Sequence, residues 1–342
     1  MVEGVMAGAM TKRTYDVLGI GNALVDFLVE VDEAELVPVG LAKGEMRLVD
    51  EATARATLDR LQAGKPSMKI MPGGSCANTI SGVARLGGTA AFHGAVGADR
   101  YGDRFEQALV ADGVRSGVRR RADGLTGHAI AFITPDGQRT FAVHLGAALS
   151  YGEEEVLEEE IRQSSILHLE GYLFDAPTLR QAAERAMEYA RRHGVTVSVD
   201  LADPGVVRRN RAFVEEVVQH RAGVLFANEE EAMALTELPA EQAVRRLAAH
   251  VEVAVVKCGS HGSLLQRGGQ LVRVAARWSK AVDTTGAGDL YAAAVLYGLC
   301  RGWDLERCGR VASHVAGLIV EQIGARPEFD LRAAVREVQE QA

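Results

Sequence analysis

The chain has 342 residues, of which 47% are hydrophobic and 25% are charged. These are ordinary values for a globular protein with a sizeable core, in one large or two smaller domains. The net charge of −8 argues against nucleic-acid binding as the main task, because phosphate backbones require a basic surface. No apolar run approaches the roughly 18 residues of a membrane span.

The cysteines and the start of the chain bear on the compartment. No cysteine forms a CxxC pair or has a histidine at metal-ligand spacing; the four are Cys76, Cys258, Cys300 and Cys308. Scattered thiols are more typical of reduced core residues than of a zinc site or a disulfide framework. Residues 1–13 lack the basic start and long apolar stretch of a signal peptide. We therefore expect a cytoplasmic protein that binds neither nucleic acid nor a membrane, with a disordered tail at 1–14.

The predicted elements alternate between short apolar strands and amphipathic helices along most of the chain. A first strand at Tyr15–Gly21 ends in a glycine turn, and a helix at Ala77–Leu86 follows Gly73-Gly74-Ser75. Further strands are predicted at 195–200, 224–227 and 253–257, and helices at 176–193, 240–250, 287–301 and 306–322. This alternation predicts an α/β fold with a mainly parallel sheet flanked by helices.

Two stretches depart from this alternation of strands and helices. Residues 25–31 alternate apolar and acidic positions, as in a half-solvated strand, and 129–145 reads as a hairpin around Pro135-Asp136-Gly137. We expect both to form a small separate sheet, a lid over the carboxyl edge of the main sheet, with a ligand bound at the junction. The expected division is a lid of 25–50 and 125–147 and a core of 15–24, 51–124 and 148–342.

The segment Asp283–Asp289, Asp-Thr-Thr-Gly-Ala-Gly-Asp, carries the strongest chemical signal. Gly286 and Gly288 let backbone N–H groups approach an anion, and the helix that begins near Ala287 adds partial positive charge. Asp289 in that first turn is suited to take a proton from an attacking hydroxyl during phosphoryl transfer. The alternative is a glycine-rich turn in which Asp289 only complements the helix N-terminus.

A second glycine turn, Gly73-Gly74-Ser75, opens the helix that contains Asn78. Backbone N–H groups and Asn78 could contact substrate hydroxyls, with Ser75 as the N-cap; the alternative is an ordinary tight turn capped by Ser75. Asn22 and Asp26 follow the first strand, where they could bind two hydroxyls of a sugar ring. Turn chemistry and a solvated strand face are the alternatives for this pair.

Three further groups are candidates for the nucleotide site. Asn228 and Glu231 begin a helix, where carboxylate oxygen could hold the water shell of Mg²⁺ or simply enrich the first turn in acid. Lys257 ends a strand before a glycine turn suited to passing beneath a nucleotide. Arg139 on the hairpin could reach over a phosphate, although a single exposed cation usually has no such role. No dinucleotide fingerprint and no P-loop occurs, which disfavours a dehydrogenase or a P-loop enzyme.

Together and in this order, these segments resemble the ribokinase (PfkB carbohydrate kinase) family from about Tyr15 to about Pro327. Asp283–Asp289 matches the specific C-terminal signature of that family. Gly73–Asn78, with Gly87-Gly88 and the stretch from Gly97 to Asp103, is similar to its N-terminal signature. Asn228 and Glu231 match its N-x-x-E element.

The resemblance implies a Rossmann-like core with a β-sheet lid and direct transfer of the ATP γ-phosphoryl group to a primary hydroxyl. It implies Asp289 as the base, an anion hole of Gly286, Ala287 and Gly288, and Mg²⁺ near Glu231. The remaining implied contacts are Asn22, Asp26, Gly73, Gly74, Ser75 and Asn78 to the sugar, and Asn228, Lys257, Gly259, Gly262 and Thr284 to the nucleotide. Many members also use potassium bound by main-chain oxygens, and Asp283, Thr285 and Gly324 match that position.

Within the family, the spacing of Asn22 and Asp26 resembles that of adenosine kinases. Leu145, Tyr172 and Leu173 are candidates to wall an apolar slot for a nucleobase. We therefore expect a kinase acting on the 5′-hydroxyl of adenosine, as a monomer or a homodimer. The alternatives are a ribokinase- or fructokinase-like sugar kinase, a non-catalytic metabolite-binding protein and, more remotely, a dinucleotide-dependent oxidoreductase.

Overall fold

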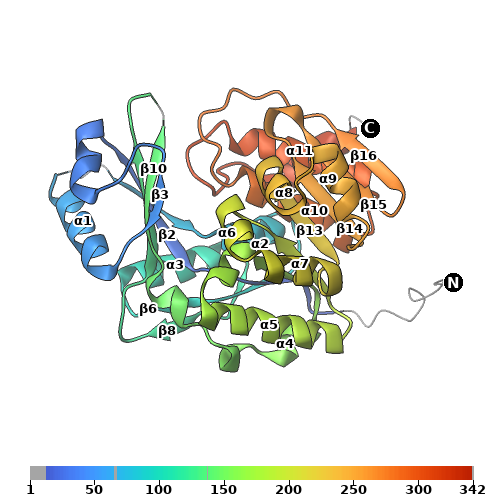
Figure 1. The fold of residues 1–342 in the computed structure, drawn as a ribbon, viewed down its shortest axis with the longest axis horizontal. Coiled ribbons are helices and arrows are strands. Elements are labelled where there is room, and N and C mark those ends of the chain that lie inside the picture. Colours follow the sequence, from blue (N-terminus) through green and yellow to red (C-terminus); the bar gives the residue numbers. More distant parts are fainter. Residues whose placement is uncertain (1–12, 65–67, 137, 341–342) are drawn as a thin grey trace.

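The computed structural model describes residues 13–64, 68–136 and 138–340, so nearly all of the tail expected at 1–14 lies outside it. Within these ranges the strands form a nine-stranded main sheet, a five-stranded small sheet and a two-stranded ribbon (Figure 1). The main sheet contains, in spatial order, β16 (Gln270–Val274), β15 (Ser263–Arg267), β14 (Val253–Lys257), β13 (Val224–Asn228), β12 (Thr196–Asp200), β11 (Ser164–Glu170), β1 (Tyr15–Ile20), β5 (Ala90–His93) and β7 (Arg115–Ser116).

The main sheet is parallel from β14 through β7, while β15 and β16 add an antiparallel edge. Because side chains alternate between the faces of a strand, successive apolar residues of β1 enter different cores. Val17 packs in one hydrophobic cluster and Leu18 in the other. The strands predicted at 195–200, 224–227 and 253–257 are β12, β13 and β14, and the predicted α/β fold class is confirmed.

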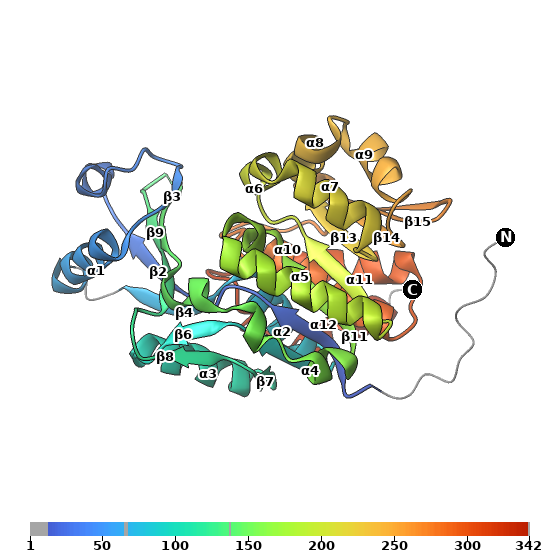
Figure 2. The same cartoon turned by 60° about the horizontal axis from the view of Figure 1, so that its bottom comes forward.

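Helices cover both faces of the main sheet. The cluster on one face includes α2 (Ser75–Arg85), α10 (Ala287–Cys300), α11 (Leu305–Ile319) and α12 (Leu331–Glu340). The cluster on the other includes α4 (Glu158–Arg162), α5 (Pro177–Arg192), α6 (Pro204–Arg209), α7 (Arg211–His220), α8 (Glu229–Thr236) and α9 (Ala240–Leu247). Figure 2 shows α5 in front of the sheet and α10 and α11 behind it. No helix in the described ranges is long and apolar enough to cross a membrane.

The small sheet stands at one end of the molecule (Figure 1). Its strands, in order, are β3 (Met46–Leu48), β10 (Arg139–His144), β9 (Gly127–Ile133), β2 (Leu24–Glu30) and β4 (Lys69–Gly73). The hairpin predicted at 129–145 is β9 and β10, which pair antiparallel. The strand β4 enlarges the small sheet beyond the expected ranges 25–50 and 125–147, because it pairs antiparallel with β2.

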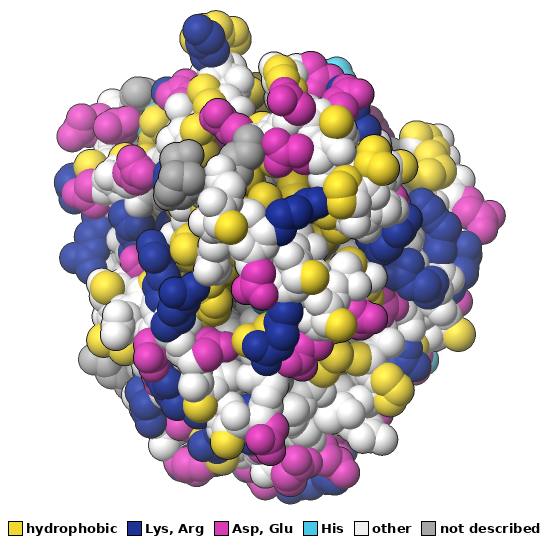
Figure 3. Space-filling model, turned by 90° about the vertical axis from the view of Figure 1, so that its left-hand side faces the viewer, with side chains coloured by type: hydrophobic (Ala, Val, Ile, Leu, Met, Phe, Trp, Pro, Cys, Tyr) yellow, Lys and Arg dark blue, Asp and Glu magenta, His cyan; other side chains and the backbone are white. Residues whose placement is uncertain are grey.

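One face of the small sheet is more buried than the sequence pattern suggested. Val25, Phe27 and Val29 are buried in the core cluster, and Phe27 contacts Tyr101 of α3 (Arg100–Ala111) edge to face. The space-filling view in Figure 3 looks onto this end of the molecule, where basic, acidic and hydrophobic side chains are interspersed. The remaining elements are α1 (Glu51–Gly64), the ribbon of β6 (Ala95–Gly97) and β8 (Arg119–Arg121), and the short helices η1 (Glu33–Val39), η2 (Gly146–Ser150), η3 (Glu153–Glu155), η4 (Gly171–Asp175) and η5 (Gly259–His261).

Candidate active site

The first turn of α10 forms the centre of the site. Its N-cap is Gly286, with φ 78°, and the helix begins at Ala287 as predicted. A Cβ on Gly286 would lie 2.5 Å from the Cβ of Ala325, so the backbone requires glycine for its conformation and for its packing. The N–H groups of this turn lie at the positive end of a 14-residue helix, where an anion is favoured.

Asp289 lies in that first turn and is tied to α2. Ser75 Oγ donates to Asp289 Oδ1 at 2.5 Å, and Asn78 Nδ2 donates to Oδ2 at 2.9 Å. Burial raises the pKa of Asp289, while the two hydrogen bonds lower it, and the net direction is upward. A half-buried carboxylate with a raised pKa and two fixed donors is oriented for proton transfer.

The glycine turn before α2 brings other predicted residues close together. Gly74, with φ 88°, is the N-cap of α2, and a Cβ on it would lie 2.3 Å from the main-chain oxygen of Asn22. A Cβ on Gly73 would lie 2.3 Å from Asp26 Oδ1. The prediction that Ser75 is the N-cap is wrong: Ser75 is the first helical residue, and its hydroxyl is bonded to Asp289 instead.

A buried carboxylate that the sequence analysis missed holds this corner together. Glu170, at the carboxyl end of β11, accepts hydrogen bonds from the Asn22 main chain at 2.7 Å and the Asn22 side chain at 2.8 Å. Its other oxygen accepts from the Cys76 main chain at 2.7 Å. Burial raises the pKa of Glu170 to about 7. The signal available in the sequence was a glutamate at the end of an apolar run, directly before Gly171.

Asp26 is half-buried on β2, and its pKa is raised to about 7. Burial is the largest cause, the negative charge of Asp289 is the next, and the charges of Arg326 and Arg139 oppose them. Asp26 and Asp289 are therefore close enough for their charges to interact.

Arg139 links the small sheet to the main body of the molecule. Its guanidinium forms an ion pair of 2.6 Å with Asp283 Oδ1 and a hydrogen bond with the hydroxyl of Thr285. The carboxylate of Asp283 also accepts from the main-chain N–H groups of Thr285 and Gly324, both at 2.7 Å. The three residues expected near potassium thus lie together, and Thr284 between them is exposed.

The carboxyl ends of β12, β13 and β14 present a row of polar side chains. Asn228 and Glu231 form a reciprocal capping box on α8, with hydrogen bonds of 2.8 Å in both directions. Lys257 Nζ forms an ion pair of 2.7 Å with Asp200 Oδ2. Burial raises the pKa of Glu231 to about 7, and the nearby Asp200 charge adds to this effect. Asp200 was not among the predicted site residues.

The donor set of this row fits Mg²⁺. Asp200 and Glu231 are buried carboxylates, and hard oxygen ligands suit this cation. In the described part of the chain no cluster of three or more His, Cys, Asp or Glu residues could hold a metal ion alone. A magnesium ion here would therefore take most of its ligands from phosphate oxygens and water.

The remaining predicted residues differ in their surroundings. After β14 the chain turns through η5, and a Cβ on Gly262 would lie 2.0 Å from the main-chain oxygen of Val274; Gly259 has φ 54° and open space around it.

Leu145 and Tyr172 are half-buried, and the Tyr172 hydroxyl donates to the Ala202 carbonyl at 3.3 Å. Leu173 is 1% exposed within a core cluster, so it packs the fold and walls no ligand.

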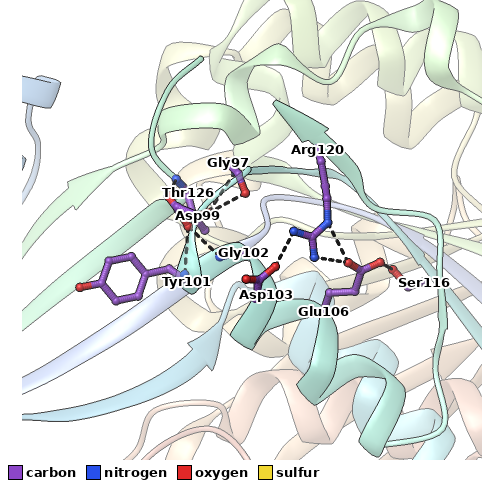
Figure 4. A network of polar contacts seen from close by, with 9 residues as sticks. All are labelled: Gly97, Asp99, Tyr101, Gly102, Asp103, Glu106, Ser116, Arg120 and Thr126. Carbon is purple, nitrogen blue, oxygen red and sulfur yellow. Dashed lines mark hydrogen bonds and ion pairs between the residues drawn. The ribbon is translucent and has the colours of Figure 1, made fainter. Parts of the chain in front are cut away.

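Asp99, within the Gly97–Asp103 stretch, has a structural role (Figure 4). Asp99 is the N-cap of α3 and accepts from the Tyr101 and Gly102 main chains. It also accepts hydrogen bonds from the main chain and hydroxyl of Thr126, directly before β9. This part of the N-terminal signature therefore anchors the small sheet to α3. A hollow of about 700 Å³ elsewhere, lined by α5 and α7, contains none of the predicted site residues.

Comparison with known proteins places this fold and site in a class. A family model of pfkB family carbohydrate kinases matches residues 35–330. An uncharacterized sugar kinase of Archaeoglobus fulgidus is 31% identical over 251 residues, which cover 72% of this chain and 96% of that protein. The structure of adenosine kinase from Sinorhizobium meliloti is 36% identical, with a TM-score of 0.87 over 95% of this chain and 99% of that one.

A probable sugar kinase protein from Rhizobium etli CFN 42 is also similar, at 33% identity and a TM-score of 0.88 over 96% of this chain and 99% of that one. The chain belongs to the PfkB family of carbohydrate kinases. It is a phosphotransferase of the ribokinase type, which confirms the predicted enzyme class and removes the oxidoreductase alternative. Membership in this family implies the use of ATP and Mg²⁺.

Proposed function

We propose that this kinase transfers the γ-phosphoryl group of ATP to the 5′-hydroxyl of a nucleoside, adenosine being the expected substrate. The observation that carries the transfer step is Asp289, a half-buried carboxylate oriented by Ser75 and Asn78 within the first turn of α10. Base and anion-binding N–H groups stand on the same helical turn, so both can act on one transferring phosphoryl group.

In the proposed reaction the hydroxyl oxygen attacks the γ-phosphorus, and the bond between that phosphorus and the bridging β,γ-oxygen breaks. ADP leaves, and the hydroxyl proton passes to Asp289. The N–H groups of Gly286, Ala287 and Gly288 stabilise charge on the transferring group. Arg139 would supply a further positive charge after exchanging Asp283 for a phosphate oxygen. Mg²⁺ bound with ATP would neutralise phosphate charge beside Glu231.

Asn22, Asp26 and Asn78 are the proposed contacts to the sugar. Asn22 Oδ1 and Asn78 Oδ1 are both buried without a hydrogen-bond partner in the described residues. Unsatisfied buried acceptors are rare and costly, so each is suited to accept from a substrate hydroxyl. Asp26 would accept from another hydroxyl, and Gly73 and Gly74 leave room for the ring.

An apolar surface beside Asp26 favours a nucleoside over a free sugar. Cross-strand register places Asp26 of β2, Ala129, Val143 and Leu48 in one row on one face of the small sheet. The adjacent row contains Phe141 and Met46, and Met46 and Leu48 are 49% and 60% exposed. Arg139 is on the same face and reaches Asp283, so this face is turned toward α10. A nucleobase would cover such apolar area, whereas a sugar ring would not.

A sugar kinase remains the alternative within the family, because two similar proteins carry the names uncharacterized sugar kinase and probable sugar kinase. The potassium site at Asp283, Thr285 and Gly324 is likewise a proposal, supported by the bonds that gather these residues. The division of the chain into a core and a lid is also a proposal. The non-catalytic alternative is disfavoured by Asp289, because binding alone needs no base.

A substrate panel tests the assignment. Purified protein is incubated with ATP, Mg²⁺ and adenosine, inosine, ribose or fructose, with and without potassium, and ADP release is followed. We expect kcat/KM for adenosine to exceed that for either free sugar by at least about 100-fold, because a free sugar leaves the apolar rows uncovered. Preferential turnover of ribose or fructose would contradict the nucleoside assignment.

A further inference from the structure

Lys257 occupies an unusual electrostatic position. Its side chain is 16% exposed, and that of its partner Asp200 is 6% exposed, so the ion pair is largely withdrawn from water. The 2.7 Å contact with this carboxylate holds the ammonium group at the carboxyl edge of the sheet.

The same ammonium abuts the first turn of α10. A Cβ on Gly288 would lie 3.3 Å from Lys257 Nζ, which places the cation beside the positive end of the helix. A cation is disfavoured at a helix N-terminus and an anion is favoured there. Two positive groups from different elements thus converge on one point next to Asp289, and a phosphate dianion is the ligand that satisfies both.

We propose that Lys257 contacts the transferring phosphoryl group and that Asp200 is the residue that positions it. The inference rests on the proposed function and names a role within that site. Asp200 holds the ammonium group of Lys257 beside α10 until ATP binds. A γ-phosphate oxygen then becomes the partner of the ammonium group. Lys257 stays protonated throughout, and the proton of the acceptor hydroxyl still passes to Asp289.

A structural ion pair is the competing explanation, but it accounts for less. A buried Lys–Asp pair often contributes little net stability, because desolvation offsets the attraction. Moreover, Asp200 and Lys257 stand at the ends of β12 and β14, on either side of β13, at the edge where ligands of parallel sheets bind. If the ion pair served only to join β12 and β14, the ammonium group of Lys257 would not need to lie beside α10.

The test compares Lys257→Met and Lys257→Arg with the wild-type protein. Calorimetry with Mg²⁺ measures the Kd of ADP and of the β,γ-imido analogue of ATP, which needs no acceptor. The preference for the analogue is the Kd of ADP divided by the Kd of the analogue. We expect Lys257→Met to reduce this ratio at least tenfold, while the Kd of ADP changes less than about threefold. With the acceptor found in the substrate panel, kcat should fall roughly 100- to 1,000-fold, as for loss of one oxyanion donor. Lys257→Arg should recover part of both losses.

Asp200→Asn tests the positioning role. This change should lower kcat about tenfold with little change in the KM of ATP, and it should have no further effect in a Lys257→Met background, because the two residues act as one unit. The matched control is Asp16→Asn, which removes the remote 2.9 Å ion pair with Arg301 and should leave kcat unchanged. If the losses of kcat caused by Asp200→Asn and Lys257→Met were additive in the double variant, the positioning role would be overturned.

Unchanged kcat and unchanged nucleotide preference in a folded Lys257→Met protein would overturn the contact itself. Should that variant not fold, Lys257→Arg and Asp200→Asn give the same comparison. The proposed function fails separately: an unaltered rate in Asp289→Asn, or no turnover of any acceptor by the wild type, would remove it. The comparison of ADP with the imido analogue would still report on Lys257.

Discussion

Asp26 is a carboxylate whose neighbours disfavour its charge. Its pKa is about 7 in the fold against an ordinary value of 3.8, with burial as the largest cause and Asp289 as the next. Between these values the folded state holds the proton that the unfolded chain has released. The contribution of Asp26 to the free energy of unfolding therefore falls as pH rises from about 4 to about 7 and then levels off. A substrate hydroxyl that donates to Asp26 would offset this cost.

Asp26→Asn should remove that dependence. We expect the variant to be more stable than the wild type at pH 8, by on the order of 2 kcal/mol, and the difference to vanish toward pH 4. Urea unfolding at several pH values measures it, with the exposed Asp123→Asn as control. The affinity for the acceptor should fall at the same time. If Asp26→Asn had the same free energy of unfolding as the wild type at every pH, Asp26 would carry no such charge penalty.

At the scale of elements, the site depends on where α10 begins. Gly286 has φ 78° and lies against Ala325, so Gly286→Ala adds both backbone strain and a clash that must move the first turn. Gly268, with φ 54° and nothing within 4 Å of its would-be Cβ, offers a matched control with strain alone. We expect both alanine variants to lose about 1 kcal/mol or more in urea unfolding, and only Gly286→Ala to lose kcat, by tenfold or more.

Equal kcat values for the two variants would show that the start of α10 can shift without consequence. Such a result would count against an anion hole built from Gly286, Ala287 and Gly288, because N–H groups displaced by even a fraction of an ångström stabilise the transition state less well.

At the scale of the whole molecule, local patterns predicted the elements but not the contacts between distant ones. Apolar runs and glycine turns identified β12, β13, β14, α5 and α10, because strand and helix periods depend on neighbouring residues. The bond from Ser75 to Asp289 spans 214 positions, so the sequence suggested only a local cap for Ser75. Glu170 and Asp200 were missed for the same reason, since their partners lie far away in the sequence.

The arrangement of the two sheets also escaped prediction in part. β4 pairs with β2 although α1 lies between them in the sequence, and this pairing of distant segments was not predicted. The ion pair of Arg139 with Asp283 joins β10 to the segment before α10 across 144 positions and sets the apolar face of the small sheet toward α10. What the sequence did indicate was the chemistry of the site, because glycines and a carboxylate at a helix N-terminus form one short segment.

The role of Asp289 is tested most directly by Asp289→Asn. The asparagine keeps the shape of the side chain but cannot accept the proton of the acceptor hydroxyl. We predict that single-turnover phosphoryl transfer falls by at least about 1,000-fold, while the Kd values of ATP and of the acceptor, measured by calorimetry, change less than tenfold. A transfer rate within tenfold of the wild type would contradict the account.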